Sequence, residues 1–257
     1  MNPFSLTETT ALVVGASRGI GLAIAQLAAR SGARVLMAAR SLDALERNAA
    51  ALRAEGHQAE TVVLDIANRD ALADVVAGLP DIDILINVSG TNIRKAMPSY
   101  TVAEYERILD TNLHGLFFLT QKVGARMIER GQGGKVIYIG SLMSLLGLPY
   151  LTVYAMTKSA LAGLTRSLAA EWGRHNIQVN CIAPGFIVTD LNRDMWQSPV
   201  MNEWLRGCQA APHTGVPEDT APLAVFLSSP GSNYITGQVI AADGGYTTTA
   251  VWPFEPA

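Results

Sequence analysis

Short apolar runs alternate with longer amphipathic stretches along most of the chain. The runs have the length of buried β-strands, and the stretches between them repeat apolar positions at helical spacing. The predicted strands cover residues 10–14, 33–39, 59–64, 82–88, 135–140, 177–183 and 237–245. The predicted helices cover residues 19–31, 42–54, 68–77, about 101–130, 152–173 and 217–228.

Strands that alternate with helices of this length form βαβ units, whose strands run parallel. Because such crossovers are right-handed, seven strands predict a doubly wound, Rossmann-type α/β sheet with helices on both faces. The unbroken series favours a single domain over residues 1–257. Residues 184–216 lack a clear period, and a long irregular segment inside a compact domain is usually functional. We predict that this segment is a lid over a substrate site.

Composition excludes several classes of protein. The 257 residues are 49% hydrophobic and 16% charged, which is typical of a globular chain. The sequence has neither 18 consecutive apolar residues nor a signal-peptide pattern, so we expect no membrane partner. The net charge is −3 without a basic block, so we expect no nucleic acid. The two cysteines and four histidines lack metal-ligand spacing, which predicts no metal site and fits a cytoplasmic location.

The sequence GASRGIG, residues 15–21, follows the first predicted strand and opens the first helix. Glycines allow a tight turn and a close approach of the backbone to a pyrophosphate, and the N–H groups of a helix N-terminus attract anions. The loop therefore predicts a dinucleotide site, with a plain glycine-rich turn as the alternative. The candidate contacts in it are Gly15, Ser17, Arg18, Gly19, Ile20 and Gly21.

The end of the second strand bears on which dinucleotide binds. NAD enzymes usually place an acidic residue there, whereas this chain has Ala39 followed by Arg40. Arg40 and Arg18 can both bind a 2′-phosphate, because guanidinium groups form bidentate bonds to phosphate. We therefore predict NADP(H), with a solvated Arg40 as the alternative. Asp65 ends the third strand, where it is either an adenine contact or an ordinary turn residue.

Tyr154 and Lys158 lie four positions apart in VYAMTKSALAGL, residues 153–164. In a helix they share one face. An ammonium beside a phenol stabilises the phenolate, so the phenol can act as a general acid and base. The alternative is an ordinary exposed helix pair.

Together, these motifs resemble the short-chain dehydrogenase/reductase family, over residues 7 to 247. The motifs that carry the resemblance are GASRGIG, Asp65, NVSG (87–90), Asn112, Ser141, YAMTK (154–158), PGFIVT (184–189) and DGG (243–245). Residues 90–100, GTNIRKAMPSY, are similar to tropinone reductases and gluconate 5-dehydrogenases. The 3-oxoacyl carrier-protein reductases are the nearest common alternative.

The resemblance implies NADPH-dependent hydride transfer between the nicotinamide and a ketone or secondary alcohol. It implies that Tyr154 is the general acid and base, and that Ser141 binds the reacting oxygen. It implies that Lys158 binds the nicotinamide ribose and that Asn112 holds a water of a proton relay. It extends the cofactor contacts to Ile66, Asn87, Val88, Gly90, Tyr154, Lys158, Pro184, Gly185, Ile187 and Thr189.

Two departures from the family pattern affect the cofactor turns. Val14 stands where the family usually has Thr, and NVSG replaces Asn-Asn-Ala-Gly. We expect backbone contacts of Val88 to preserve binding, with a loss of side-chain hydrogen bonds between the two turns. Arg94 is a further open case, because it suits either a sugar-acid carboxylate or a surface ion pair.

The resemblance also implies a homotetramer built on the long helices after the fourth and fifth strands. The last residues carry Trp252 and Phe254, which a monomer would cover poorly, so we predict that this tail packs on a neighbouring subunit. A dinucleotide-binding sensor without catalysis is the non-enzymatic alternative. The presence of Asn112, Ser141, Tyr154 and Lys158 argues against it.

Overall fold

The computed structural model describes residues 2–190 and 192–248. Seven strands form one parallel sheet in the order β3-β2-β1-β4-β5-β6-β7. Their bounds are Thr10–Val14 (β1), Arg34–Ala39 (β2), Ala59–Val63 (β3), Ile84–Asn87 (β4), Gly134–Ile139 (β5), Ile177–Pro184 (β6) and Val239–Ala242 (β7). The prediction of a Rossmann-type parallel sheet with helices on both faces is confirmed.

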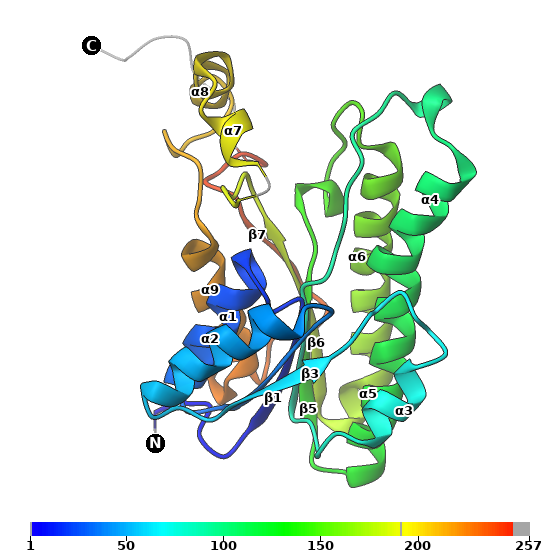
Figure 1. Ribbon diagram of the computed structural model, residues 1–257, viewed down its shortest axis with the longest axis vertical. Helices are drawn as coiled ribbons and strands as arrows, with labels where there is room; N and C mark the ends of the chain where they lie inside the picture. Colours follow the sequence, from blue (N-terminus) through cyan, green and yellow to red (C-terminus); the bar gives the residue numbers. More distant parts are fainter. Residues whose placement is uncertain (1, 191, 249–257) are drawn as a thin grey trace.

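Helices cover the two faces of the sheet in separate sets (Figure 1). One set is α1 (Gly19–Arg30), α2 (Leu42–Ala54) and α9 (Pro217–Ser228), and the other is α3 (Leu72–Ala77), α5 (Gly115–Arg130) and α6 (Thr152–Trp172). Side chains of a strand alternate between faces, so β1 buries Ala11 and Val13 in one core and Leu12 and Val14 in the other. This explains why its sequence is apolar throughout.

The strand order reverses between β1 and β4, which are neighbours in the sheet although two βα units separate them in sequence. Their pairing sets Val14 beside Asn87, so the loops after both strands leave the sheet at the same edge. In open α/β sheets, ligands bind in the crevice outside the carboxyl ends of the strands at such a reversal.

The predicted helix 101–130 is interrupted. The structure has α4 (Val102–Leu109), a π-helical turn (Asp110–His114) and then α5. Thr101 and Glu104 form a capping box at the start of α4, with the Glu104 N–H donating to Thr101 Oγ1 at 3.2 Å. The apolar spacing continues through the π-turn, so periodicity alone did not reveal it.

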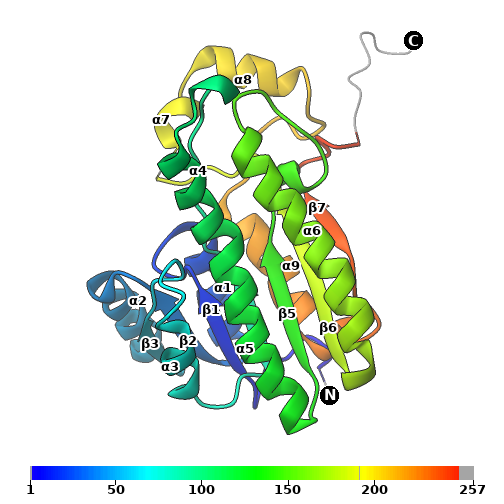
Figure 2. The ribbon, with the colours of Figure 1, turned by 90° about the vertical axis from the view of Figure 1, so that its right-hand side faces the viewer.

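The segment 184–216 is more ordered than its sequence indicated. It contains α7 (Arg193–Trp196) and α8 (Pro199–Arg206), and Ile187 pairs with Gly215 in an isolated bridge. Both helices lie beyond the carboxyl ends of the strands (Figures 1 and 2). The action of residues 184–216 as a lid stays a prediction.

The other differences between the predicted and observed elements are at element ends. The largest is at the start of α3, which is predicted at residue 68 and lies at Leu72 in the structure.

Two further predictions concern assembly and membranes. The tail residues Trp252 and Phe254 lie outside the described residues. None of the helices in residues 2–190 and 192–248 combines the length and apolar character needed to cross a bilayer.

Candidate active site

The glycine loop lies against the ends of the neighbouring strands. Gly15 has a φ of +95°, and a Cβ there would lie 2.9 Å from the Ser89 nitrogen. A Cβ on Gly21 would lie 2.1 Å from the Gly15 carbonyl oxygen. The N–H groups of Gly15 and Ala16 both donate to the Ala38 carbonyl, at 2.8 and 3.2 Å. Glycine is therefore required at both positions, and the loop is held close to the sheet.

The N-terminus of α1 is open to an anion. Arg18 is the N-cap residue in an extended conformation, and its side chain makes no capping hydrogen bond. The first N–H groups of a helix have no intrahelical partner, and the helix dipole favours negative charge there. Asn48 on α2 donates from Nδ2 to the Ser17 carbonyl at 3.0 Å and holds the loop from outside. This arrangement fits a dinucleotide pyrophosphate.

Arg18 and Arg40 are both exposed, and neither has an ion-pair partner within the described parts of the chain. Arg40 directly follows Ala39, the last residue of β2. The two guanidinium groups are thus free to bind a phosphate of a cofactor.

The turn after β3 gives mixed support to its predicted residues. Asp65 is exposed, and its Oδ1 accepts a hydrogen bond from the Ala67 N–H at 3.1 Å. This contact belongs to the turn alternative, although Oδ2 makes no hydrogen bond with the described residues. Ile66 is 5% exposed, and a Cβ on Gly115 would lie 2.0 Å from its carbonyl oxygen. The side chain of Ile66 is therefore core.

The turn after β4 is joined to the glycine loop by main-chain bonds. The N–H groups of Val88 and Ser89 both donate to the Val14 carbonyl, at 2.9 and 3.0 Å. These bonds connect the two turns without a side-chain hydroxyl at position 14. Asn87 is fully buried and donates from Nδ2 to Thr120 Oγ1 at 3.1 Å. Its side chain is directed into the interior, so only its main chain is available to a cofactor.

Tyr154 and Lys158 lie together on α6. The Lys158 ammonium nitrogen is 5.7 Å from the centre of the Tyr154 ring. Lys158 is 3% exposed and donates to the Ile139 carbonyl at 2.7 Å, at the end of β5. The ion-paired groups of the described residues do not include Lys158, so no carboxylate among them neutralises its charge.

Asn112 holds the loop after β4 near this pair. It is fully buried, its Oδ1 accepts from the Thr91 N–H at 2.7 Å, and its Nδ2 donates to the Thr91 carbonyl at 2.8 Å. Nδ2 also donates to Thr157 Oγ1 at 3.2 Å, and that hydroxyl donates to the Tyr154 carbonyl. Asn112 lies in the π-turn, a feature frequent at functional sites.

Gly90 lies close to both Lys158 and Asn112. A Cβ at this position would lie 3.5 Å from both Lys158 Nζ and Asn112 Oδ1. The structure therefore brings Gly90, Asn112, Tyr154 and Lys158 together, from segments 90–112 and 154–158 of the sequence.

Ser141 leaves β5 at the start of a 3-10 turn (Leu142–Ser144). The Ser141 N–H donates to Ser144 Oγ at 3.2 Å, and Ser144 Oγ donates to the Lys158 carbonyl at 2.8 Å. Ser159 Oγ donates to the Met143 carbonyl at 2.9 Å. The Ser141 turn is therefore fastened to α6. Sequence reasoning missed Ser144, because no local spacing signals a contact to position 158.

The loop after β6 reaches the glycine loop. Pro184 is the last residue of β6, and a Cβ on Gly185 would lie 2.6 Å from Asp243 Cα. The Thr189 N–H donates to Asn192 Oδ1 at 2.7 Å, which orders the turn. A Cβ on Gly19 would lie 3.5 Å from Thr189 Cγ2. A pyrophosphate between the two loops would therefore be held from both sides.

Aromatic residues connect the segment 184–216 to the catalytic region. The Phe186 ring lies 5.3 Å from Trp196, 5.3 Å from Trp204 and 5.0 Å from Tyr246, measured between ring centres. Phe186 and Tyr246 pack with Tyr154 against the buried residues Leu142, Met143 and Leu151. Phe186, Trp196 and Trp204 lie within the predicted lid segment, residues 184–216. Tyr246 lies outside that segment and was missed, although it directly follows the DGG motif.

Arg94 crosses from the loop after β4 to α7. Its Nη1 lies 2.9 Å from Met195 Sδ, a weak acceptor, and the described residues offer it no ion pair. Lys95 instead forms the ion pair, with both Glu104 oxygens at 2.8 Å. Hydrogen bonds from Lys95 and Thr101 lower the pKa of Glu104 to about 2. The surface ion pair considered for Arg94 is therefore not found among these residues.

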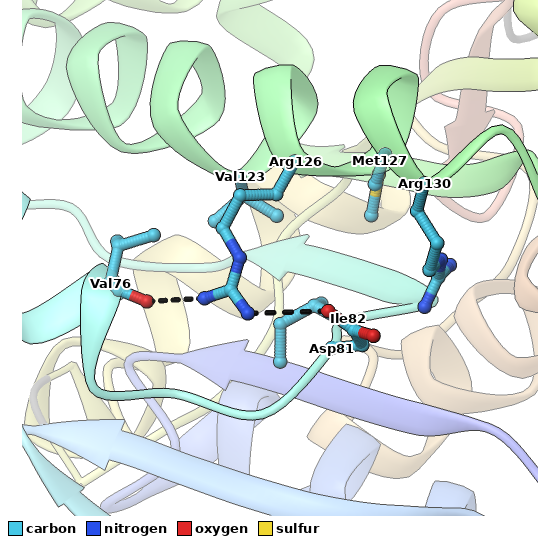
Figure 3. Close-up of a pocket in the computed structure, with 7 residues that line it drawn as sticks. All are labelled: Val76, Asp81, Ile82, Val123, Arg126, Met127 and Arg130. Atoms are coloured by element: carbon cyan, nitrogen blue, oxygen red, sulfur yellow. Dashed lines mark hydrogen bonds and ion pairs between the residues drawn. The ribbon is translucent and has the colours of Figure 1, made fainter.

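Two cavities differ in position and size. One of about 400 Å³ lies between the loop after β6 and the turn after β7, and Gly185, Phe186, Ile187 and Asp243 contribute to its lining. None of the four predicted catalytic residues lines it. The other, about 10 Å³, lies at the opposite edge of the sheet beneath α5 (Figure 3).

Residues 2–190 and 192–248 contain no cluster of three or more His, Cys, Asp or Glu side chains that would hold a metal.

The arrangement of motifs matches a known family. A sequence profile described as enoyl-(acyl carrier protein) reductase matches residues 15–247. Gluconate 5-dehydrogenase from Gluconobacter oxydans is 38% identical over 96% of this chain and 97% of its own. The chain belongs to the short-chain dehydrogenase/reductase family. The family resemblance drawn from the motifs is therefore confirmed.

Other members with high similarity carry different names. A tropinone reductase homologue from Arabidopsis thaliana is 36% identical over 95% of this chain and 94% of its own. A 3-oxoacyl-[acyl-carrier-protein] reductase from Chlamydia trachomatis is 36% identical over 93% and 98%. The crystal structure of a gluconate 5-dehydrogenase from Burkholderia cenocepacia with NADP and tartrate has a TM-score of 0.92, 33% identity and coverage of 97% and 99%.

Membership of the short-chain dehydrogenase/reductase family makes the protein an NAD(P)-dependent oxidoreductase that acts on CH–OH groups of a small-molecule substrate. The relatives do not share one cofactor. The Burkholderia structure contains NADP, whereas an NAD-dependent glycerol dehydrogenase from Listeria innocua is 34% identical over 95% of this chain and 96% of its own.

Proposed function

We propose that the protein interconverts a secondary alcohol and a ketone of a sugar-acid type substrate, with NADP(H) as cofactor. The observation that carries this proposal is Arg94, an exposed guanidinium at the catalytic end of the sheet whose neighbour across the gap to α7 is a thioether. A carboxylate is a far better acceptor for it than sulfur, because charge-assisted bonds are short and strong.

The chain's own residues divide the chemistry among them. When bound, the nicotinamide cofactor supplies or accepts the hydride. Tyr154 gives its proton to the carbonyl oxygen in reduction and takes it from the hydroxyl in oxidation. Ser141 donates a hydrogen bond to that oxygen, and Lys158 stabilises the phenolate. The fixed positions of these groups mean that little reorganisation is needed as charge develops.

Asn112 has a mainly positioning role in this proposal. Both hydrogens of its amide are used, by the Thr91 carbonyl and by Thr157 Oγ1. A relay water between Lys158 and solvent therefore has the remaining lone pair of Oδ1, or the main chain of Asn112, as its partner. The side chain keeps Gly90 close to Lys158 and so keeps the ribose site open.

The cofactor preference is supported by charge. Arg18 and Arg40 have no carboxylate as an ion-pair partner within the described residues. Because Ala39 ends β2, no acidic side chain stands there to repel a 2′-phosphate. Hydrogen bonds that involve a charged group contribute about 1.5–3 kcal/mol each. Two such bonds are enough to favour NADP(H) strongly over NAD(H).

The substrate class is supported by the surroundings of Tyr154. Phe186, Trp204 and Tyr246 supply aromatic surface, which suits the C–H faces of a carbon chain, while Arg94 supplies a single positive charge. The relatives named gluconate 5-dehydrogenase agree with this chemistry. A 3-oxoacyl carrier-protein substrate, the alternative that the relatives also suggest, carries a thioester in place of a free carboxylate, so Arg94 would be dispensable for it.

The test is a substrate panel with NADP⁺ or NADPH, run on the unmodified protein and on Arg94→Gln. We expect turnover of gluconate-type acids and a KM raised about 10–150-fold in Arg94→Gln, which corresponds to one charged hydrogen bond. The matched control is the neutral polyol of the same length, whose KM should not change. An unchanged KM for the acid, or turnover of acetoacetyl thioesters alone, would overturn the proposal.

A further inference from the structure

The indole N–H of Trp196 is a buried donor without an acceptor. Trp196 is 7% exposed, and its Nε1 has no hydrogen-bond partner among the described residues. Buried N–H groups in native proteins are nearly always paired, so each exception calls for an explanation. The main chain at this position is satisfied, since Asn202 Nδ2 donates to the Trp196 carbonyl at 3.1 Å.

Trp196 lies at the substrate end of the molecule. Its ring is 5.3 Å from that of Phe186, which packs in the same cluster as Tyr154. The preceding residue, Met195, contacts Arg94. The ring that carries the unpartnered donor therefore lies beside Phe186, and its neighbour in the sequence contacts Arg94.

The other unpartnered buried atoms of the described chain belong to the body of the protein. They are Asn87 Oδ1, Arg130 Nε and Thr220 Oγ1. Asn87 contacts Thr120 and Arg130 forms an ion pair with Asp83, while Thr220 lies on α9. Trp204 contacts Phe186 at the same 5.3 Å but is 39% exposed. Trp196 thus differs from Trp204 in its buried, unpartnered N–H and not in its ring contact with Phe186.

The helix α7 is a single turn, and Trp196 meets Phe186 through ring packing rather than through a directional hydrogen bond. We propose that Trp196 is a specificity-determining residue, whose indole N–H donates to a hydroxyl or carboxylate oxygen of the substrate when α7 closes over it. The inference rests on the proposed function for the position of the substrate. It requires a second oxygen beyond the reacting one, which a simple apolar ketone lacks.

Trp196→Phe tests this directly, because it keeps an aromatic ring and removes the N–H. The KM for the best hydroxylated substrate should rise about tenfold, the effect of one hydrogen bond, while kcat and the Kd of NADPH change little. The KM for the matching substrate without that oxygen should not change. Trp204→Phe is the matched control: any loss of aromatic surface acts on both substrates alike, so the ratio of the two KM values should change by less than about twofold.

A second measurement uses the unmodified protein, so it does not depend on the folding of a variant. The indole resonances of ¹⁵N-tryptophan-labelled protein are assigned from single Trp→Phe variants at the other three tryptophans. Addition of NADPH with tartrate, a hydroxy acid that has no ketone to be reduced, should move the Trp196 indole proton downfield. No movement at a saturating concentration, together with an unchanged KM in Trp196→Phe, would overturn the inference.

The two proposals fail in different ways. If gluconate-type acids react and depend on Arg94 but ignore Trp196, the proposed function stands and this inference is wrong. If no sugar acid reacts, the proposed function is wrong, and Trp196→Phe is then measured with whichever hydroxyketone the panel reduces. A tenfold KM effect there supports the donor role, and no effect excludes it.

Discussion

The two edges of the parallel sheet differ in whether their cationic side chains have carboxylate partners. At the carboxyl edge, Arg18 and Arg40 face solvent and Arg94 contacts a thioether. Within residues 2–190 and 192–248, Lys158 donates only to a main-chain carbonyl. At the amino edge, Arg130 pairs with Asp83 at 2.8 Å. These four cations at the carboxyl edge lack a carboxylate partner among the described residues, whereas Arg130 at the amino edge has one. Lys95 is an exception near the carboxyl edge, because it pairs with Glu104.

The amino edge has two sets of polar contacts. Asp83 Oδ2 accepts the Thr10 N–H at 2.8 Å, where β1 begins, while its other oxygen contacts Arg130. Arg126 donates to the Val76 carbonyl at 2.5 Å and contacts Asp81 at 3.3 Å (Figure 3). The exception is Arg130 Nε, and the cavity of about 10 Å³ that Arg130 lines has room for one water.

This difference separates stability from function. Cations that are paired within the protein secure the start of the strands. We propose that Arg18, Arg40, Arg94 and Lys158, which have no carboxylate partner within the described residues, bind ligands instead. Substitutions at the carboxyl edge should therefore reduce activity without unfolding the protein, and those at the amino edge should do the reverse.

The largest effect is expected for Tyr154→Phe, which keeps the ring and removes the proton donor. Turnover should fall about 10²–10⁴-fold, the usual contribution of a positioned acid or base, while the Kd of NADPH and the melting temperature stay unchanged. Steady-state rates with NADPH measure it, and Tyr246→Phe in the same cluster is the control. Near-normal turnover would exclude the phenol as the acid.

The next effect concerns the cofactor. In Ala39→Asp combined with Arg40→Ser, the ratio of kcat/KM for NADPH to that for NADH should fall at least about 100-fold, because one charged bond to the 2′-phosphate is lost and a repulsion is added. Rates with both cofactors measure it. Equal efficiency with both in the unmodified protein would contradict the assignment of Arg18 and Arg40.

Asp83→Ala tests the amino edge. It leaves the Arg130 guanidinium and the Thr10 N–H without their acceptor, so the free energy of unfolding should fall by about 2–3 kcal/mol. Urea unfolding measures it, with kcat expected to stay the same. Glu60→Gln, which breaks an exposed pair with Arg34, is the control and should cost less than about 1 kcal/mol. An equal loss of unfolding free energy in both variants would show that the amino-edge pair contributes no more to stability than an exposed pair.

A smaller effect is expected for Ser144→Ala, which releases the Ser141 N–H and the Lys158 carbonyl. Two neutral hydrogen bonds of about 1 kcal/mol or less position this turn, so kcat should fall about tenfold without a change in the Kd of NADPH. Ser159→Ala loosens the Met143 carbonyl instead and should cost less. If both variants behave alike, Ser144 has no special link to Ser141.

The smallest effect is a pH dependence at the amino edge. Burial lowers the pKa of Lys135 to about 8 from its usual 10.5, although Nζ donates to Asn233 Oδ1 at 2.7 Å. Between these values the unfolded chain binds more protons than the folded one, so this group makes stability rise with pH. From pH 7 to 9 the gain should be about 1 kcal/mol. Urea unfolding of Lys135→Met should lack this increment, and an identical pH profile would disprove it.

The sequence by itself determined the fold and the existence of the site. The strand and helix pattern reflects burial on one or both faces, and the GASRGIG loop and the Tyr154–Lys158 spacing are local. Such features depend on residues within one helical turn or one strand–turn–helix unit. Their geometry could therefore be predicted without knowledge of distant contacts.

The tertiary structure decided how that site is held and what surrounds it. The π-turn that carries Asn112 leaves no mark in the apolar spacing, and the bond from Ser144 to the Lys158 carbonyl joins two different segments. The contact of Arg94 with a thioether involves Met195, which is 101 positions away in the sequence. The buried N–H of Trp196 follows from packing against Phe186. Each of these contacts depends on the position of a distant segment, and only the folded chain specifies that position.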